Sequence, residues 1–182
     1  MLDAGFLELV RYGVRSPSHN AIVETLPELD DTTLPDDLRI KYEFSFPGIE
    51  GKFPGWRRYG KDGYGEDTIT GKGYNDGGTN SANGRGRVWP IFTGERGQYE
   101  LANATKNGKI STNDLLTLRD TYIKAMELFA NEGLMIPEQV WDGVGNNEVY
   151  KFSMGEGTNS ATPLAWSHAE YIKLLRSYSD EK

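Results

Sequence analysis

Apolar residues recur at helical spacing in five stretches of the chain, and each stretch predicts a helix. The helices are expected over residues 2–10, 18–26, 88–103, 111–130 and from 163 onward. Thr162 is expected to cap the last helix, with Pro163 at its first position, where proline removes no helical hydrogen bond. The buried face of that helix is expected to carry Leu164, His168, Tyr171, Leu174, Leu175 and Tyr178.

The stretches between these helices have a different pattern. Residues 38–46 alternate apolar and polar side chains, which predicts a strand that ends at Pro47. Residues 48–86 and 134–162 are rich in Gly, Asn and Asp and have little periodicity, so both are expected to be long loops. The first loop carries Phe53, Trp56, Tyr59, Tyr64 and Tyr74. Long loops that carry aromatic side chains on a helical scaffold are typical of binding sites.

Composition and charge narrow the possible functions. The 182 residues have the size of one domain and a formal net charge of -7. A nucleic-acid partner is not expected, because phosphate binding needs clustered Lys and Arg. The absence of cysteine excludes disulfides and cysteine-based chemistry. No apolar run approaches the roughly 18 residues of a membrane helix, so no membrane partner is expected.

The first residues read directly into a predicted helix, with no signal peptide. We therefore expect a single domain that is part of a longer chain. The sequence does not indicate a cellular compartment.

Three polar features outside the loops have structural interpretations. The segment 103–114 matches an EF-hand loop at Gly108 and Asp114, but it offers too few carboxylates for calcium. A helix end, an Asn-Gly turn and a new N-cap are therefore expected there. Glu95 and Arg96 are expected in a buried or partly buried ion-pair network. His168 is expected to be a packed histidine with its hydrogen bonds satisfied.

Four segments together resemble the bacterial and archaeal glucoamylase and glucodextranase family of inverting glycoside hydrolases. They are residues 56–66, residues 84–101, residues 135–142 (Met-Ile-Pro-Glu-Gln-Val-Trp-Asp) and residues 161–171. The resemblance implies a mainly α fold, with the chain forming the C-terminal part of an (α/α)6 barrel with long functional loops. The upstream segment that carries the general acid of the family has no counterpart here.

The resemblance also assigns roles to individual residues. It implies that Glu138 is the catalytic base, which removes a proton from the attacking water. Substrate contacts are expected from Arg58, with Arg57 as its close competitor, and from Tyr59, Asp62, Glu66, Trp89 and Trp141. The implied substrate is an α-1,4 or α-1,6 glucan, cleaved at its non-reducing end. No cofactor and no metal are expected, and members of the family are often secreted.

The residues alone leave structural alternatives open, because Glu138 could be a surface carboxylate and the two tryptophans could be core residues. Since the general acid is missing, the isolated chain is expected to be inactive. Another possible function is a non-catalytic carbohydrate-binding or structural fragment. Such a fragment would fold by association with itself or with an upstream half. A lyase or phosphorylase built on a similar barrel is a further alternative.

Overall fold

The computed structural model describes residues 2–73 and 82–182. Its elements in chain order are η1 (Ala4–Leu7), α1 (Glu8–Arg11), α2 (Asn20–Val23), α3 (Leu26–Leu29), β1 (Lys41–Phe44), β2 (Phe53–Arg57), β3 (Val88–Trp89), α4 (Pro90–Thr105), α5 (Thr112–Thr117), η4 (Leu118–Ile123), α6 (Lys124–Leu128) and α7 (Ala165–Asp180). Here η1 is a 3-10 helix and η4 is a π-helical turn within the helix that runs from α5 to α6. No helix in the described part of the chain is long and apolar enough to cross a membrane.

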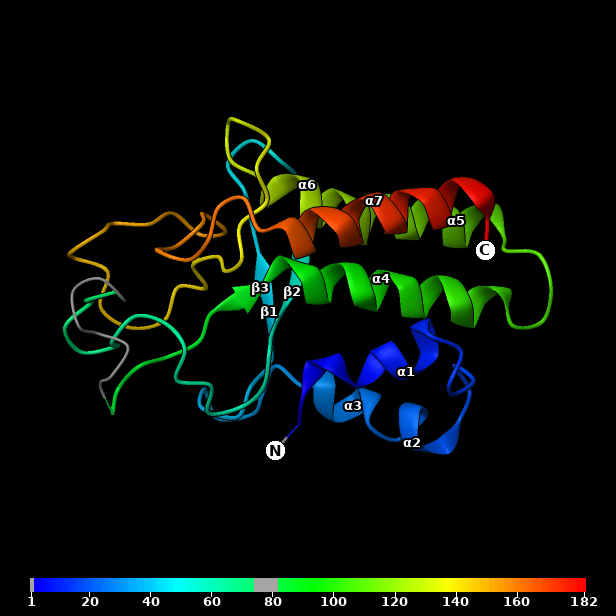
Figure 1. The fold of residues 1–182 in the computed structure, drawn as a ribbon, viewed down its shortest axis with the longest axis horizontal. Coiled ribbons are helices and arrows are strands. Elements are labelled where there is room, and N and C mark those ends of the chain that lie inside the picture. The colour runs from blue at the N-terminus through cyan, green and yellow to red at the C-terminus, as the bar shows by residue number, and fades with distance from the viewer. Residues whose placement is uncertain (1, 74–81) are drawn as a thin grey trace.

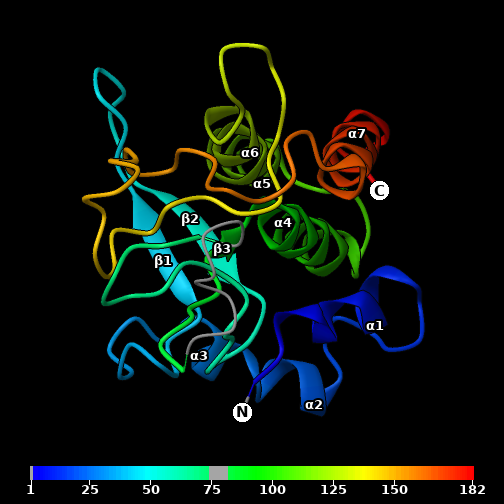
Figure 2. The same cartoon turned by 60° about the vertical axis from the view of Figure 1, so that its left-hand side comes forward.

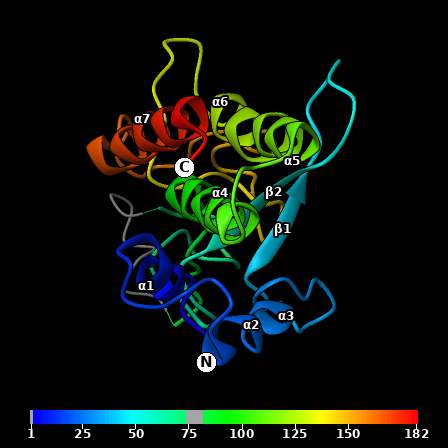
Figure 3. The same ribbon diagram turned by 90° about the vertical axis from the view of Figure 1, so that its right-hand side faces the viewer.

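Helix α4 lies at the centre of the molecule. Helix α7 and the α5–α6 helix pack on one side of it, and the short helices α1 to α3 lie on the other (Figures 1 and 3). Two glycines allow α7 to approach closely. A Cβ on Gly94 would lie 2.5 Å from Cγ of Glu170, and one on Gly97 would lie 3.0 Å from a methyl group of Leu174. These glycines lower helix propensity, and burial of α4 on all sides offsets that cost.

The helical predictions are confirmed for most of the chain, with shifts at the ends. Within the segment 18–26 only α2 is helical, and a second short helix, α3, begins at its last residue. The last helix begins at Ala165, and Leu164 occupies the N-cap position predicted for Thr162. Thr162 and Pro163 lie in a bend before this helix, and the peptide bond between them is cis. On α7 Leu174 is fully buried, whereas the other predicted core positions are only half-buried.

A small three-stranded antiparallel sheet, in the order β1-β2-β3, accompanies the helices. The first strand confirms the strand predicted within 38–46, but β2 lies inside a segment predicted to be loop. All five residues of β2 are buried, so no alternation of polar and apolar residues marks it. Pro54 pairs with β1, whereas β3 pairs only with Trp56 and Arg57, so proline breaks no bond on that side.

The long loops gather at one end of α4, where the sheet also lies (Figures 1 and 2). Residues 134–162 form the predicted loop, held by isolated bridges to residues on either side. Tyr74 and most of the Asn75–Asn83 run lie outside the described residues. The chain therefore combines a helical scaffold with a small sheet and a loop-bearing end.

Candidate active site

Three segments distant in sequence meet at the loop-bearing end of the molecule. Arg58 directly follows β2, Trp89 ends β3, and Glu138 lies in the loop beyond α6. The backbone N–H of Val140 donates to the carbonyl of Val88 at 2.8 Å, so the loop is docked on β3. The sheet thus brings together three of the residues that the sequence predicted.

Arg58 is the centre of a cluster of rings. Its Nε and Nη2 atoms donate to the two carboxylate oxygens of Asp62 at 3.1 and 2.9 Å. Its guanidinium lies 4.6 Å from the ring centre of Tyr59, 5.3 Å from that of Tyr64 and 5.2 Å from that of Trp89. The side chain keeps 29% exposure. A planar donor fixed in this way can still offer hydrogen bonds to a ligand.

Glu138 lies half-buried beside this cluster. Its backbone N–H donates to the carbonyl of Ala161 at 2.8 Å, and the Ala161 N–H donates to its carboxylate at 3.4 Å. Burial raises the pKa of Glu138, and the Ala161 N–H and the charge of Arg58 oppose that rise. A general base is more effective when its pKa is raised toward the working pH while the group remains ionised.

Tyr64 is a member of the cluster that the sequence did not single out as a ligand. Its ring lies 6.3 Å from that of Trp89, and the residue is 38% exposed. Burial raises its pKa, and the negative charge of Glu138 raises it further. The Asp62 carboxylate accepts a hydrogen bond from the Tyr64 N–H at 3.0 Å and stabilises the turn between the two residues. The position of Tyr64 two residues after the predicted ligand Asp62 was the sequence signal that could have identified it.

A buried network of charges lies beneath the cluster. Asp142 accepts from Arg85 at 2.5 Å and from Arg87 at 3.2 Å, and Arg87 also pairs with Glu66 at 2.8 Å. The side-chain amide of Gln139 accepts from the Arg87 backbone at 2.6 Å and donates to the carbonyl of Tyr64 at 2.9 Å. The loops that carry Glu138 and Arg58 are therefore tied to each other by buried polar groups.

Three residues that were predicted to contact the substrate lie in or beside this buried network and do not reach the ring cluster around Arg58. Arg57 is 1% exposed, and its guanidinium donates to the carbonyls of Gly86, Asp36 and Arg39. Glu66 is 3% exposed and is held by Arg87. Trp141 is 4% exposed and lies under Arg87, at 4.1 Å. In this structure the three residues support the loops from below, which corrects their expected role as sugar contacts.

A groove of about 610 Å³ adjoins Arg58 on the side of α1. Exposed apolar side chains line it, and they are Leu9, Tyr12, Val14 and Trp166. Trp166 is 53% exposed at the start of α7. The sequence indicated this tryptophan only as part of a matching segment. The groove continues the surface beside Arg58 with exposed apolar side chains.

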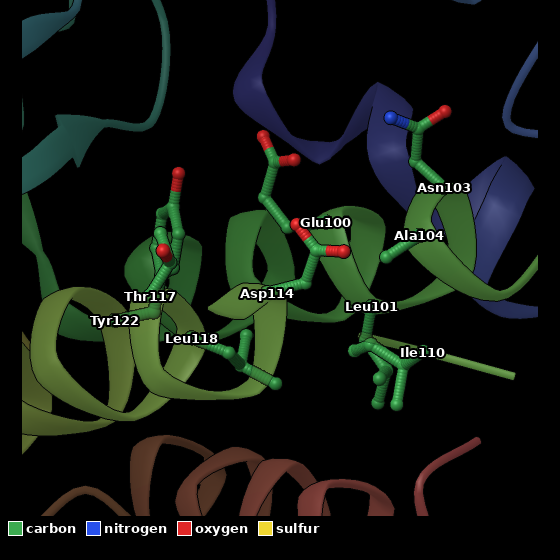
Figure 4. A pocket seen from close by; sticks show the side chains of 9 residues that line it. All are labelled: Glu100, Leu101, Asn103, Ala104, Ile110, Asp114, Thr117, Leu118 and Tyr122. Carbon is green, nitrogen blue, oxygen red and sulfur yellow. The ribbon is translucent and has the colours of Figure 1, made fainter. Parts of the chain in front are cut away.

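A second hollow, of about 340 Å³, lies at the opposite end of α4, beside α5 (Figure 4). The side chains of Glu100 and Asp114 point into it, but Glu100 pairs with Arg96 and Asp114 bonds to Ser111. This confirms the end of a helix and a new N-cap in place of an EF-hand loop, since the Ser111 side chain accepts from the Asp114 N–H. In the described part of the chain no three His, Cys, Asp or Glu side chains are placed to hold a metal ion.

The predicted ion-pair network is confirmed for Arg96 but not for Glu95. Arg96 pairs with Glu100 and with Asp30, and Glu95 faces Arg11 at 3.6 Å. These contacts join α4 to the N-terminal helices rather than to the site.

Comparison with known proteins gives a consistent result. A sequence model described as Glycosyl hydrolases family 15 matches residues 1–176. A glucoamylase from Clostridium sp. (strain G0005) is 41% identical over all 182 residues, which make up 20% of that protein. A crystal structure of a bacterial glucoamylase complexed with acarbose matches the whole chain at 39% identity, with a TM-score of 0.69.

The chain covers 21% of that crystallised protein, so it spans about a fifth of the length of both relatives. The family match covers nearly all of the chain, including the segments that carry Arg58, Trp89 and Glu138. The chain belongs to glycosyl hydrolase family 15.

Proposed function

We propose that this chain carries the base side of the active site of a glucan hydrolase of the glucoamylase type. The observation that supports the proposal is the position of Glu138, a half-buried carboxylate beside an arginine set among aromatic rings. The matched relatives are both described as glucoamylases. The substrate is an α-1,4 or α-1,6 glucan, cleaved at its non-reducing end.

In the proposed reaction Glu138 removes a proton from a water molecule as the water oxygen bonds to the anomeric carbon. The glycosidic C–O bond breaks, and a general acid gives its proton to the leaving oxygen. The configuration at the anomeric carbon is inverted. Two carboxyl groups roughly 6.5–9.5 Å apart are needed for this chemistry.

The general acid is proposed to lie outside this chain. Asp62, the other carboxylate at the cluster, has both oxygens engaged by Arg58, so it is poorly suited to donate a proton. Arg58, Tyr59, Tyr64 and Trp89 are proposed to hold the sugar, Arg58 through its hydroxyls and the rings through the apolar face of the glucose unit.

The barrel also belongs to this proposal. The apolar side chains that line the groove beside α1 are exposed in this chain, and such patches mark surfaces that other parts of a protein cover. We assign the groove to the contact with the rest of an (α/α)6 barrel. The alternative is a non-catalytic fragment that associates with itself through the same surface.

The test is a pair of assays of glucose release from maltooligosaccharides. The 182-residue chain alone is expected to release none. In a hydrolytically active protein that contains this chain, Glu138→Gln is expected to lower kcat by about 100-fold or more, because proton removal from water is lost. Glu148→Gln, at an exposed carboxylate, is the matched control and should leave kcat unchanged.

Glucose release by the chain alone would show that the acid lies within it. Near-normal turnover of Glu138→Gln would remove Glu138 from the mechanism. A homodimer of the chain that binds glucan without cleaving it would favour the non-catalytic alternative.

A further inference from the structure

The first turn of α7 holds the loop that carries Glu138. The backbone N–H of Leu164 donates to the carbonyl of Ile136 at 3.0 Å. The hydroxyl of Ser167 donates to the carbonyl of Pro137 at 3.1 Å. Nε2 of His168 accepts from the backbone N–H of Ile136 at 2.9 Å. The peptide groups 135–136 and 137–138 are thus bonded to side chains of the first turn of α7, and the group 136–137 between them is bonded to the backbone of Leu164.

The bond to His168 constrains the protonation of the imidazole. An imidazole nitrogen accepts a hydrogen bond only when it carries no proton, so Nε2 must be bare and Nδ1 must hold the hydrogen. When the ring takes up a second proton, both nitrogens become donors. An N–H group of the ring would then face the N–H of Ile136, and the bond would be replaced by repulsion.

We propose that Ser167 and His168 are positioning residues for Glu138, and that His168 acts in this way only while its imidazole is neutral. The inference rests on the proposed role of Glu138 as the base. It assigns no contact between His168 and the substrate. The helix sets the direction of the Glu138 side chain through the backbone of residues 136 and 137.

Burial supports this assignment. Ser167 is fully buried and Ile136 is 3% exposed, whereas Glu138 is half-buried. Because Ile136 is buried, no water can replace an acceptor that its N–H loses. A protonated imidazole, which would present a second donor to this N–H, is therefore costly. A shift of this peptide would expose Glu138 to water and so reduce the burial that is the main cause of its raised pKa.

Charged side chains are numerous on α7 and on the helices that contact it. They are Glu170, Lys173, Arg176 and Asp180 on α7, Glu95, Arg96 and Glu100 on α4, Arg119 and Asp120 on η4, Lys124 and Glu127 on α6, and Glu8 and Arg11 on α1. In the described ranges 2–73 and 82–182, none of these forms an ion pair with His168. The hydrogen bond from Ile136 is the contact that a proton on the ring would break.

The test is NMR of the purified chain, which needs no catalytic activity. On acidification of the wild-type protein, the Ile136 amide signal is expected to shift. Its protection from hydrogen exchange, taken relative to the intrinsic rate at each pH, is expected to fall by about tenfold as the bond is lost. His168→Gln keeps an acceptor that does not titrate, so it should show neither change. His168→Leu removes the acceptor at similar size, and its Ile136 amide should be weakly protected at every pH.

The carboxyl carbon of Glu138 gives the second measurement. Its pKa should stay raised in His168→Gln and fall toward that of an ordinary glutamate in His168→Leu, because the loop relaxes toward water. Ser167→Ala should lower it in the same way without changing the imidazole. If His168→Leu does not fold, the pKa of Glu138 in Ser167→Ala still tests the proposal. Equal Glu138 titrations in His168→Gln and Ser167→Ala would overturn the proposal.

An active protein that contains this chain separates this inference from the proposed function. There His168→Leu should lower kcat by about tenfold with little change in KM, and His168→Gln should restore most of the rate. If the NMR results hold but Glu138→Gln retains full turnover, the positioning is correct and the role of Glu138 is not. If Glu138→Gln is inactive and the NMR signals are unaffected by the variants, only the positioning is wrong.

Discussion

Two clusters of buried charge occupy opposite sides of α4, and they are built differently. Near the site, Asp142 has both oxygens bonded to arginines, Oδ2 to Arg85 and Oδ1 to Arg87. Arg87 in turn holds Glu66 and the carbonyl of Val144. Apart from Nη2 of Arg87, the buried polar atoms of these side chains have partners in the described part of the chain.

Between α1, α4 and α7, two buried glutamates share one cation. Glu170 lies 2.7 Å from Nη1 of Arg11, and Glu95 lies 3.6 Å from the same atom. Burial raises the pKa of Glu95 to about 9, helped by the nearby charges of Glu8 and Glu170 and opposed by Arg11. Burial likewise raises the pKa of Glu170 to about 7, against the effect of Arg11.

The difference shows what each cluster contributes. A buried charge is tolerated where every group has a partner, and removing one partner is costly. A buried carboxyl without enough cations becomes neutral instead. The network beneath the site is therefore a frame of paired charges that holds the loops. The junction between α1 and the α4–α7 pair depends on bound protons.

The largest effect on stability is expected in the charge network beneath the site. Asp142→Ala leaves Arg85 and Arg87 buried without their shared partner, and we expect it to lower the free energy of unfolding by about 3–5 kcal/mol. Denaturant unfolding followed by circular dichroism measures the change. A loss below about 1 kcal/mol would mean that water replaces the carboxylate, and the frame would then resemble an ordinary surface cluster.

The second prediction concerns the pH dependence of the helix junction. In the unfolded chain both glutamates titrate near their ordinary pKa of 4.5, whereas in the folded chain they titrate at about 7 and about 9. Between these values the folded state binds more protons, so stability falls as pH rises. From pH 7 to pH 9 Glu95 contributes most of the change and Glu170, half ionised at pH 7, adds a smaller part, so we expect a loss of about 2–3 kcal/mol.

Unfolding curves at several pH values test this decline. Glu95→Gln mimics the protonated carboxyl, so it should abolish most of the decline between pH 7 and pH 9 and change stability little at pH 7. Stability that instead rose over this range, or a decline that survived in full in Glu95→Gln, would show that the buried glutamate is ionised in the folded state.

The smallest effect is expected from an exposed ion pair. Arg176 and Asp180 lie 2.8 Å apart on the solvent side of α7, and the Arg176 side chain is 76% exposed. Asp180→Ala is expected to change stability by less than about 0.5 kcal/mol, because water screens the pair. A larger loss, in the same unfolding assay, would mean that pairing alone determines the cost and that burial does not distinguish the two clusters.

The sequence predicted the parts of the molecule that periodicity and local capping determine. Helix α4, the turn at Gly108 and the Ser111 cap all follow from nearby residues. His168 was predicted to be hydrogen-bonded because it lies on the inward face of the last helix. The hydrogen bond that its Nε2 accepts from the Ile136 N–H confirms this prediction. The family match covers the segment that made Glu138 the candidate base.

The remaining features depend on contacts between distant residues. Strand β2 has no alternation because all five of its residues are buried, so they look like loop in the sequence. Arg57 and Arg58 are neighbours with opposite environments, and only the sheet decides which one faces outward. Trp141 is buried by Arg87, a partner 54 positions earlier that no local pattern indicates.

The glycine at position 94 has a consequence for protein engineering. Any side chain there would press on Glu170, three residues beyond Ser167, and would push α7 away from α4. Because Ser167 and His168 hold the backbone before Glu138, that displacement would be transmitted to the carboxylate. The size of the residue at position 94, in the contact between α4 and α7, would therefore control the orientation of the proposed base, although this contact lies outside the proposed site.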